Sequence, residues 1–238
     1  MRSQRGGSTL ITRVFADLRA QLLSGNFVPR QRLRVATLAG AHGVSLNVVR
    51  EALNRLAGEG LVDVEPNCGF SVRGLSVEDL VDLVAQRVVL ESTALRQCIE
   101  HSSPDWQASV LAAHHRLRKT PLTLDDEAKS LNPQWISRHD DFHRVILEAC
   151  GSPRLFQMAR QLADAAELYH RALLPATGRD EEMEREHEAL LNAILAEDAD
   201  RAVDVLKAHL ERTRDVMLPL LQGAVASSET ALAPLPAH

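Results

Sequence analysis

Hydrophobic residues recur every three to four positions over much of the chain, which is the period of one face of an α-helix. Three such stripes open the sequence: Ile11 to Leu22, residues 35–41, and the residues that follow Ser45. His42-Gly43 forms a tight joint between the second stripe and the third. Two short helices joined in this way are typical of a helix-turn-helix.

Two β-prone runs come next in the chain. Residues 61–64 and 70–73 flank Pro66-Asn67-Cys68-Gly69, a group that favours a turn, and the pattern predicts a β-hairpin. Three helices followed by a hairpin make a winged helix-turn-helix. We place this domain at residues 9–75, behind a polar, mobile arm at residues 1–8.

From residue 76 the helical spacing continues, and the sequence carries no further strand pattern. Ser76-Val77-Glu78-Asp79 resembles a capping box. An N-cap residue followed by proline marks three more helix starts, at Ser103-Pro104, Asn132-Pro133 and Ser152-Pro153. Two further stripes complete a mainly α-helical chain, in which an all-α domain of about six helices spans residues 76–222 and a flexible tail spans residues 223–238.

The third stripe has a polar face opposite its aliphatic one. Leu46, Asn47, Arg50 and Asn54 share this face, and Ser45 stands where an N-cap hydroxyl is expected. Amide and guanidinium groups can pair in two-pronged fashion with adenine and guanine edges in a major groove. With an arginine beside the second helix and a glycine in the wing, the expected DNA-binding residues are Arg34, Ser45, Asn47, Arg50, Asn54 and Gly69.

The net charge of the chain changes sign at the boundary between the two domains. The whole sequence carries a net charge of −5, but residues 1–75 hold ten arginines and no lysine against five acidic residues, which makes +5 and leaves −10 for the remainder. A basic domain can collect phosphates while an acidic body is repelled by them. The division favours a nucleic-acid partner for the first domain.

The three cysteines, Cys68, Cys98 and Cys150, are an odd number without metal-ligand spacing. They favour buried thiols in a reducing compartment over a redox sensor at Cys68. The sequence has neither a signal-peptide pattern nor the apolar run of about 20 residues that a membrane helix needs. We therefore expect a cytoplasmic protein without membrane attachment.

Four histidines of the second domain lie on apolar helix faces. His139 and His143 are four residues apart and share a face, while His187 and His209 each accompany a leucine ridge. Any one of them alone would be read as an ordinary structural residue. Imidazoles that meet inside a helical bundle are ligands for a borderline divalent ion such as zinc, and the joint pattern favours that reading.

Residues 9–75 resemble the DNA-binding domain of the GntR family of bacterial transcription regulators. The third helix of that family carries a Val-Ser-x-x-x-Val-Arg-Glu-Ala-Leu signature, which Val44-Ser45 and Val49-Arg50-Glu51-Ala52-Leu53 match. The usual Arg-Thr-Pro between the two parts is Leu46-Asn47-Val48 here, so a base- or phosphate-contacting arginine is missing at position 46. The resemblance implies DNA binding, but the family's consensus operator does not carry over.

Residues 76–222 resemble the all-helical FCD ligand-binding domain of the FadR subgroup within this family. Many FCD domains hold a metal through an Asp-x-x-x-His pair and two later histidines, and the three histidine positions are matched by His143, His187 and His209. His139 stands where aspartate is usual, which leaves the first ligand open between His139 and Asp140. The resemblance implies a divalent metal ion, zinc in the first place, with nickel and manganese as alternatives.

Arg87 and Glu91 are four residues apart on the first long helix of this domain, and Arg87 follows its apolar stripe. They form either a modest salt bridge between neighbouring turns or part of a ligand site. The resemblance implies the second role, in which Arg87 receives the carboxylate of an effector.

The leading hypothesis is a transcription regulator, in the first place a repressor, that binds operator DNA as a homodimer and responds to a small organic acid bound near the metal. A metal-dependent hydrolase is an alternative, because His139-Asp140-Asp141-Phe142-His143 imitates the zinc-protease pattern His-Glu-x-x-His. A DNA-binding protein without metal or effector is the third.

Overall fold

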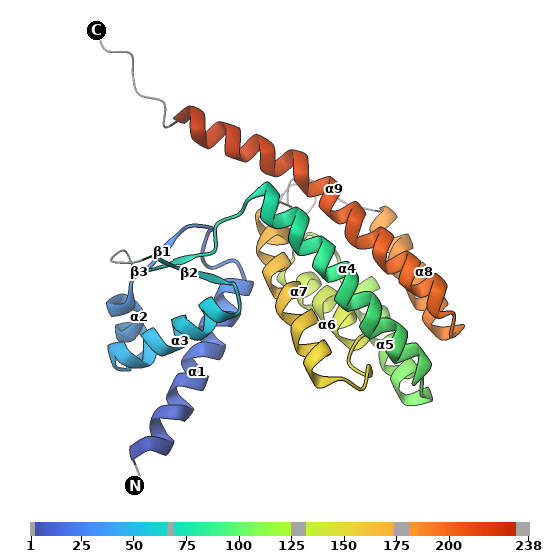
Figure 1. Ribbon diagram of the computed structural model, residues 1–238, viewed down its shortest axis with the longest axis horizontal. Coiled ribbons are helices and arrows are strands. Elements are labelled where there is room, and N and C mark those ends of the chain that lie inside the picture. Colours follow the sequence, from blue (N-terminus) through green and yellow to red (C-terminus); the bar gives the residue numbers. More distant parts are fainter. Residues whose placement is uncertain (1–2, 66–68, 125–131, 174–180, 232–238) are drawn as a thin grey trace. The chain divides into compact units, whose positions relative to one another are not determined.

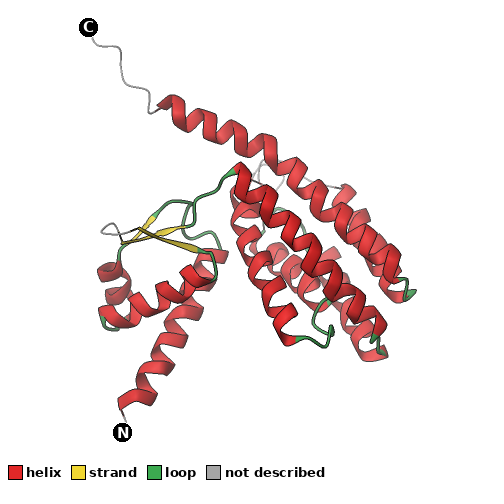
Figure 2. Cartoon of the chain, viewed as in Figure 1, coloured by secondary structure: helices red, strands yellow, loops and turns green. Residues whose placement is uncertain are grey.

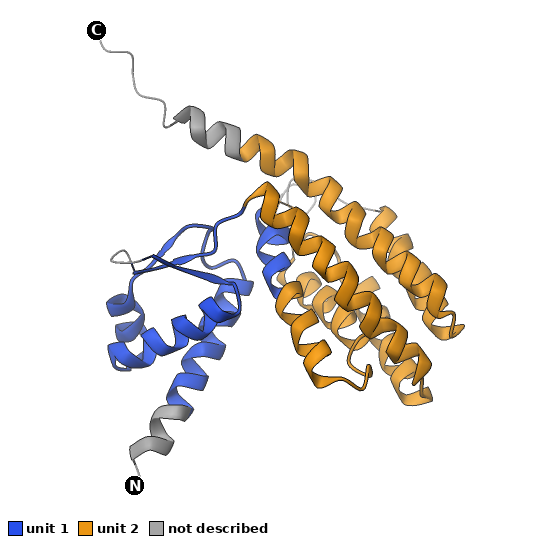
Figure 3. Cartoon of the chain, viewed as in Figure 1, with its two compact units in different colours: residues 1–75, 164–172 blue, residues 76–163, 173–238 orange. Residues whose placement is uncertain are grey.

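The computed structural model describes residues 3–65, 69–124, 132–173 and 181–231, with side chains described between residues 9 and 224 of these ranges. The chain divides into two compact units (Figure 3). Unit 1 contains residues 1–75 and 164–172, and unit 2 contains residues 76–163 and 173–238. The sequence does not indicate that residues 164–172 group with the first unit.

The described residues among the first 75 form three helices and a small antiparallel sheet (Figures 1 and 2). In chain order the elements are α1 (Ser3–Leu23), β1 (Arg32–Leu33), α2 (Val35–His42), α3 (Leu46–Gly58), β2 (Val62–Glu65) and β3 (Gly69–Val72). The strand order is β1-β3-β2, with Leu33 and Val64 both opposite Phe70. The predicted winged helix-turn-helix is confirmed, and β1 went unpredicted because two residues are too few to show a strand period.

Aliphatic side chains from α1, α3 and the sheet form the core of unit 1. Leu18, Val49, Leu53 and Val72 are at most 1% exposed, and Leu168 belongs to the same cluster. Burial of one such side chain contributes about 1.5–3 kcal/mol. The inward leucines and valines of α3 therefore fix which of its sides faces outward.

Gly43 closes α2 in the left-handed conformation with φ +63. Its N–H donates to the carbonyl of Gly40, and the N–H of Val44 donates to the carbonyl of Ala39. A side chain is strained at this φ, so glycine suits the position. The tight turn leads directly into α3.

Unit 2 is built from the six remaining described helices, although the C-terminal part of α7, residues 164–172, belongs to unit 1. They are α4 (Val77–Glu100), α5 (Pro104–Arg118), α6 (Pro133–Val145), α7 (Pro153–Leu173), α8 (Glu181–Leu195) and α9 (Ala199–Ala231). The predicted helical second domain is confirmed.

Side-chain caps start these helices where the sequence indicates. The hydroxyl of Ser76 accepts from the N–H of Asp79 at 3.1 Å, that of Ser103 from Trp106 at 3.2 Å, and the side chain of Asn132 from Gln134 at 2.9 Å. Inside the bundle, α9 packs along α4 and α8, while α5 packs along α6 and α8. The inward faces of α6, α8 and α9 can thus meet.

Both chain ends are more helical than the sequence suggests. α1 begins at Ser3, within the arm expected at residues 1–8, and α9 runs through Pro219 and Gly223 to Ala231, within the expected tail. A glycine costs a helix only about 1 kcal/mol, so it does not by itself end one. Of the helices described, none is long and apolar enough to cross a membrane.

Candidate DNA interface and metal centre

The outer face of α3 carries the side chains expected to contact DNA. Val49, Ala52, Leu53 and Leu56 are fully buried, which turns the opposite side of the helix to solvent. The residues exposed there are Leu46, Asn47, Arg50 and Asn54. Helix-turn-helix proteins place such a helix in the major groove, with its N-terminal residues against base edges.

Ser45 occupies the N-cap position of α3, but its hydroxyl makes no capping hydrogen bond. The backbone carbonyl of Ser45 accepts the N–H of Val48 at 3.1 Å, which is the donor that the hydroxyl would otherwise take. The predicted hydrogen bond from the helix start to the Ser45 hydroxyl is therefore wrong, although the helix starts where predicted. The exposed hydroxyl is available to a phosphate oxygen.

Arg34 and Gly69 are the remaining expected contacts, and both are exposed. Arg34 precedes α2 without capping it through its side chain. Gly69 opens β3 with φ +93, a conformation that favours glycine, and it pairs with Glu65. The hairpin tip, Pro66-Asn67-Cys68, lies outside the described residues.

The base of the wing is held by Asp63. Its carboxylate accepts from the guanidinium of Arg73 and from the backbone N–H of Gly74, each at 3.0 Å. These bonds tie β2 to the chain that follows β3. Nothing in the sequence pattern of the two strands indicates this role for Asp63.

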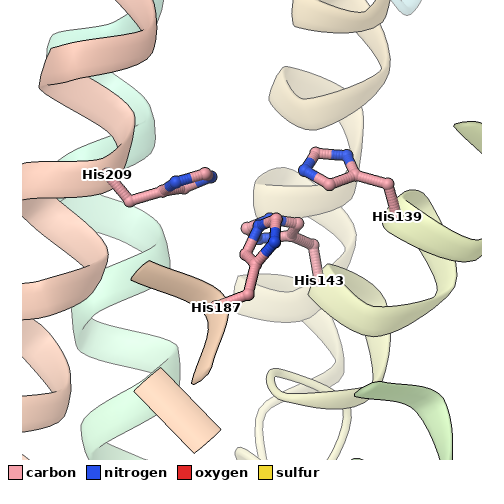
Figure 4. Close-up of side chains that lie close together, drawn as sticks. All are labelled: His139, His143, His187 and His209. Atoms are coloured by element: carbon pink, nitrogen blue, oxygen red, sulfur yellow. The ribbon is translucent and has the colours of Figure 1, made fainter. Parts of the chain in front are cut away.

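The four predicted histidines come together in unit 2. His139 and His143 lie on α6, His187 on α8 and His209 on α9, and their rings converge (Figure 4). All four are buried, with exposed fractions of 3–8%. One ligand nitrogen from each lies within 4.8 Å of the others.

The donor set and its spacing fit a metal ion. Two nitrogens bound to one tetrahedral zinc at about 2.0–2.1 Å lie about 3.4 Å apart. Nε2 of His143 and Nε2 of His187 are separated by 3.3 Å, a distance that also suits a hydrogen bond between the two rings in the metal-free protein. Four imidazoles suit zinc or nickel better than manganese, which prefers oxygen ligands.

Burial keeps two of these imidazoles neutral. It lowers the pKa of His143 well below its usual value, and the neighbouring histidines and Arg87 lower it further. The pKa of His187 is lowered in the same way, first by burial and then by His209 and His139. A metal needs the neutral form of imidazole, so the site is ready to bind at neutral pH.

Glu186 contacts the histidine cluster through His209. Its carboxylate accepts from Nδ1 of His209 at 2.8 Å and from Nε and Nη2 of Arg212 at 2.5 and 2.9 Å. Burial alone would raise the pKa of Glu186, but the bonds and charges of His209 and Arg212 outweigh it and lower the pKa to about 2. The sequence analysis missed both residues, although Glu186 adjoins His187 and Arg212 follows His209 by three.

Asp140 lies outside the histidine cluster. Its carboxylate accepts from Nη2 of Arg160 at 2.7 Å, and His139 takes the place inside, stacked on Trp135 with ring centroids 4.8 Å apart. The sequence left His139 and Asp140 as alternatives for the first ligand. The structure places His139 beside the other three histidines. Asp140 is also unsuited to serve as the base of a zinc-protease site, because it is ion-paired elsewhere.

Arg87 and Glu91 form a buried ion pair on α4, with Nε to Oε1 at 2.6 Å and side chains 6% and 0% exposed. Oε2 of Glu91 has no hydrogen-bond partner in the described part of the chain. Since Arg87 contributes to the lowered pKa of His143, its charge lies within electrostatic reach of the cluster.

A pocket of about 530 Å³ opens on another side of the cluster, between α5, α6 and α8. It reaches His187 and is also lined by His114, Trp135, Met183 and Arg118. Burial lowers the pKa of His114, although Glu188 opposes the shift. The pocket therefore combines apolar, aromatic and charged groups beside the histidines.

Comparison with known proteins identifies both halves of the chain. Residues 10–72 match the family model of bacterial regulatory proteins, gntR family, and residues 82–212 match that of the FCD domain. The chain belongs to the gntR family. This gntR-family chain is 33% identical over 214 residues to the HTH-type transcriptional regulator BphR of Paraburkholderia xenovorans, covering 88% of this chain and 85% of BphR.

Other relatives agree. The HTH-type transcriptional repressor GlaR of Escherichia coli is 32% identical, covering 89% of this chain and 95% of GlaR. Among solved structures, E. coli McbR/YncC is similar with a TM-score of 0.75 at 25% identity, covering 89% of this chain and 98% of McbR. A gntR-type regulator from Rhodococcus has the same fold, with a TM-score of 0.74 at 24% identity over 88% of this chain and 97% of its own. The protein is a DNA-binding transcription regulator, and the hydrolase alternative is wrong.

Proposed function

We propose that this regulator is a repressor that binds its operator as a homodimer and changes its affinity for DNA when a small organic acid binds near a divalent metal in the FCD domain. The observation that carries the proposal is the convergence of four buried imidazoles from three helices, which supports the metal. Repression is inferred from the relative GlaR, a transcriptional repressor that matches this chain over almost its whole length.

Charge explains why the effector should be an anion. Four neutral imidazoles leave the charge of a divalent ion unbalanced, and Arg87 adds a further positive charge nearby. Glu91 offsets only one of these charges. Surplus positive charge in a buried site is costly, so an organic anion that neutralises it gains binding energy.

Arg87 is the residue we assign to the effector carboxylate, with Glu91 as its partner when the effector is absent. The ion pair uses only Nε of Arg87, so both Nη nitrogens remain for a two-pronged contact.

Regulation further requires that the effector bind the DNA-competent and DNA-incompetent states with unequal affinity, since equal affinity shifts no equilibrium.

The metal is tested first. Purified protein is stripped with a chelator, titrated with zinc, nickel and manganese, and analysed for bound metal. We expect about one zinc or nickel ion per chain. His143→Ala and His209→Ala should lose it, while His115→Ala, an exposed histidine of α5, should keep it. If all three variants keep the metal, it binds elsewhere and these histidines are structural. Wild-type protein that takes up none of the three metals would favour the third hypothesis, a regulator without metal.

DNA binding is tested on the region upstream of the protein's own gene over a series of salt concentrations. Arg50→Ala should bind markedly more weakly, because a two-pronged contact to a base is worth about 1–3 kcal/mol. Arg201→Ala, an exposed arginine at the start of α9, serves as the control and should bind normally. Equal binding by the two variants would remove Arg50 from the interface.

A further inference from the structure

Leu46 is the first residue of α3 and is 46% exposed. Val49 and Leu53, three and seven positions further along the helix, are fully buried and occupy the core side of α3. Asn47, next to it, is exposed as well. The helix therefore presents a branched apolar side chain beside an amide at its N-terminal end.

Isolated exposed leucines are common on protein surfaces and need no explanation by themselves. The position of Leu46 is what gives it meaning. It shares the outer face of α3 with Asn47, Arg50 and Asn54, and N-terminal residues of a recognition helix are the ones that meet base edges. Whatever base lies opposite Leu46 must offer it an apolar surface.

Only one base does so in the major groove. Guanine presents two acceptors there, adenine an acceptor and a donor, and cytosine a donor, whereas thymine adds its C5-methyl group. A leucine against one of the polar edges would leave hydrogen-bonding groups without partners, at a cost of about 1–3 kcal/mol each. Contact with the thymine methyl instead removes apolar surface from water on both sides.

We propose that Leu46 determines operator specificity by packing on the C5-methyl group of a thymine in each half-site. Together with Asn47, which suits adenine, it directs the N-terminal end of α3 to A·T pairs, while Arg50 one turn later suits guanine. The inference requires only the DNA-binding role of the family. It is independent of the proposed metal and effector.

The test removes the methyl group and nothing else. The operator is first located by footprinting on the upstream DNA. Each thymine of the protected half-sites is then replaced singly by deoxyuridine, which keeps base pairing and every other group of the edge. Burial of one methyl group contributes about 0.8 kcal/mol, so we expect one replacement to weaken binding about fourfold in each half-site where it is made.

The same DNA panel is measured with Leu46→Ala. This variant should bind the thymine operator more weakly, and it should no longer distinguish thymine from deoxyuridine at that one position. Leu46→Met should keep part of the distinction. Leu111→Ala removes a leucine of similar exposure, 49%, from α5 and should behave as the wild type throughout.

Two results would overturn the proposal. Wild-type protein that is indifferent to deoxyuridine at every thymine does not read a methyl group at all. Leu46→Ala that loses affinity equally for thymine and deoxyuridine operators has lost a contact other than the methyl. Circular dichroism of each variant checks that the overall helix content is unchanged. Leu46→Arg gives a second measurement, since it should select guanine at the same position in a randomised operator library.

Discussion

Glu186 holds Nδ1 of His209, so that Nε2 of that ring is the nitrogen left for the cluster. Arg212 in turn holds the carboxylate with two hydrogen bonds. A ligand imidazole that is oriented in this way loses little freedom when it binds a metal. At the scale of single residues, the proposed centre therefore depends on side chains that do not touch the ion.

Glu186→Gln is expected to weaken zinc binding by about 10–100-fold, because the neutral amide orients His209 less firmly and makes it less basic. The measurement is competition between the protein and a fluorescent chelator. Glu188→Gln, on the same helix with its side chain 56% exposed, is the matched control and should bind zinc normally. Equal affinities for the two variants would contradict the role of Glu186.

His139→Asp is expected to shift metal preference. A carboxylate at this position adds a negative charge and an oxygen donor, which favours manganese relative to zinc and nickel. Competitive loading followed by metal analysis should show a higher ratio of manganese to zinc than in the wild type. A ratio that does not change would mean that His139 does not contact the ion.

Among the elements, the starts of two helices differ in what their serines do. Ser103 caps α5 through its hydroxyl, whereas Ser45 stands at the start of α3 without a side-chain cap. The difference separates a serine that stabilises its helix from one whose hydroxyl is left for another partner. Both helices have serine at the N-cap position, so sequence alone cannot tell the two roles apart.

Ser103→Ala should lower the free energy of unfolding by about 1 kcal/mol, since it removes a capping hydrogen bond. Ser45→Ala should change stability much less and should weaken operator binding instead, if its hydroxyl contacts a phosphate. Urea denaturation and a binding titration on both variants make the comparison. A larger loss of stability from Ser45→Ala than from Ser103→Ala would contradict it.

Much of this fold could be predicted because its signals are local. Hydrophobic period, cap residues and the turn at Gly43 each act within a few positions of the chain, and the helix-turn-helix, the hairpin and the six later helices followed from them. The four histidines were found from their helix faces and from the resemblance to a family. The rest depends on contacts between distant positions, such as Asp140 with Arg160 and Glu186 with Arg212, which no local pattern encodes.

For the whole molecule, buried neutral histidines link stability to pH. His114, His143 and His187 have a pKa lowered below the usual 6.5, chiefly by burial. Below 6.5 the unfolded chain therefore binds protons that the folded chain does not, and acid favours unfolding. Glu186 acts at lower pH, because its contribution is complete above 4.5 and is lost as the pH falls toward about 2.

Chelator-treated protein should accordingly lose stability between pH 6.5 and 5, by up to about 1.4 kcal/mol per pH unit for each of these histidines. Denaturant unfolding at several pH values measures the slope. His114→Gln, which removes one buried imidazole from outside the cluster, should make the slope shallower. Stability that is constant or rises on acidification would contradict the prediction.

The packing of Leu168 also affects how the protein is made. This residue is 6% exposed within the core of unit 1, but it is translated about 100 residues after β3, the last strand of that unit. At about 5–20 residues per second, a ribosome needs roughly 5–20 s to cover that distance. During that interval residues 1–75 have been translated, but one piece of their core has not yet been synthesised. The core of the DNA-binding unit is thus completed only after much of the FCD domain has been translated.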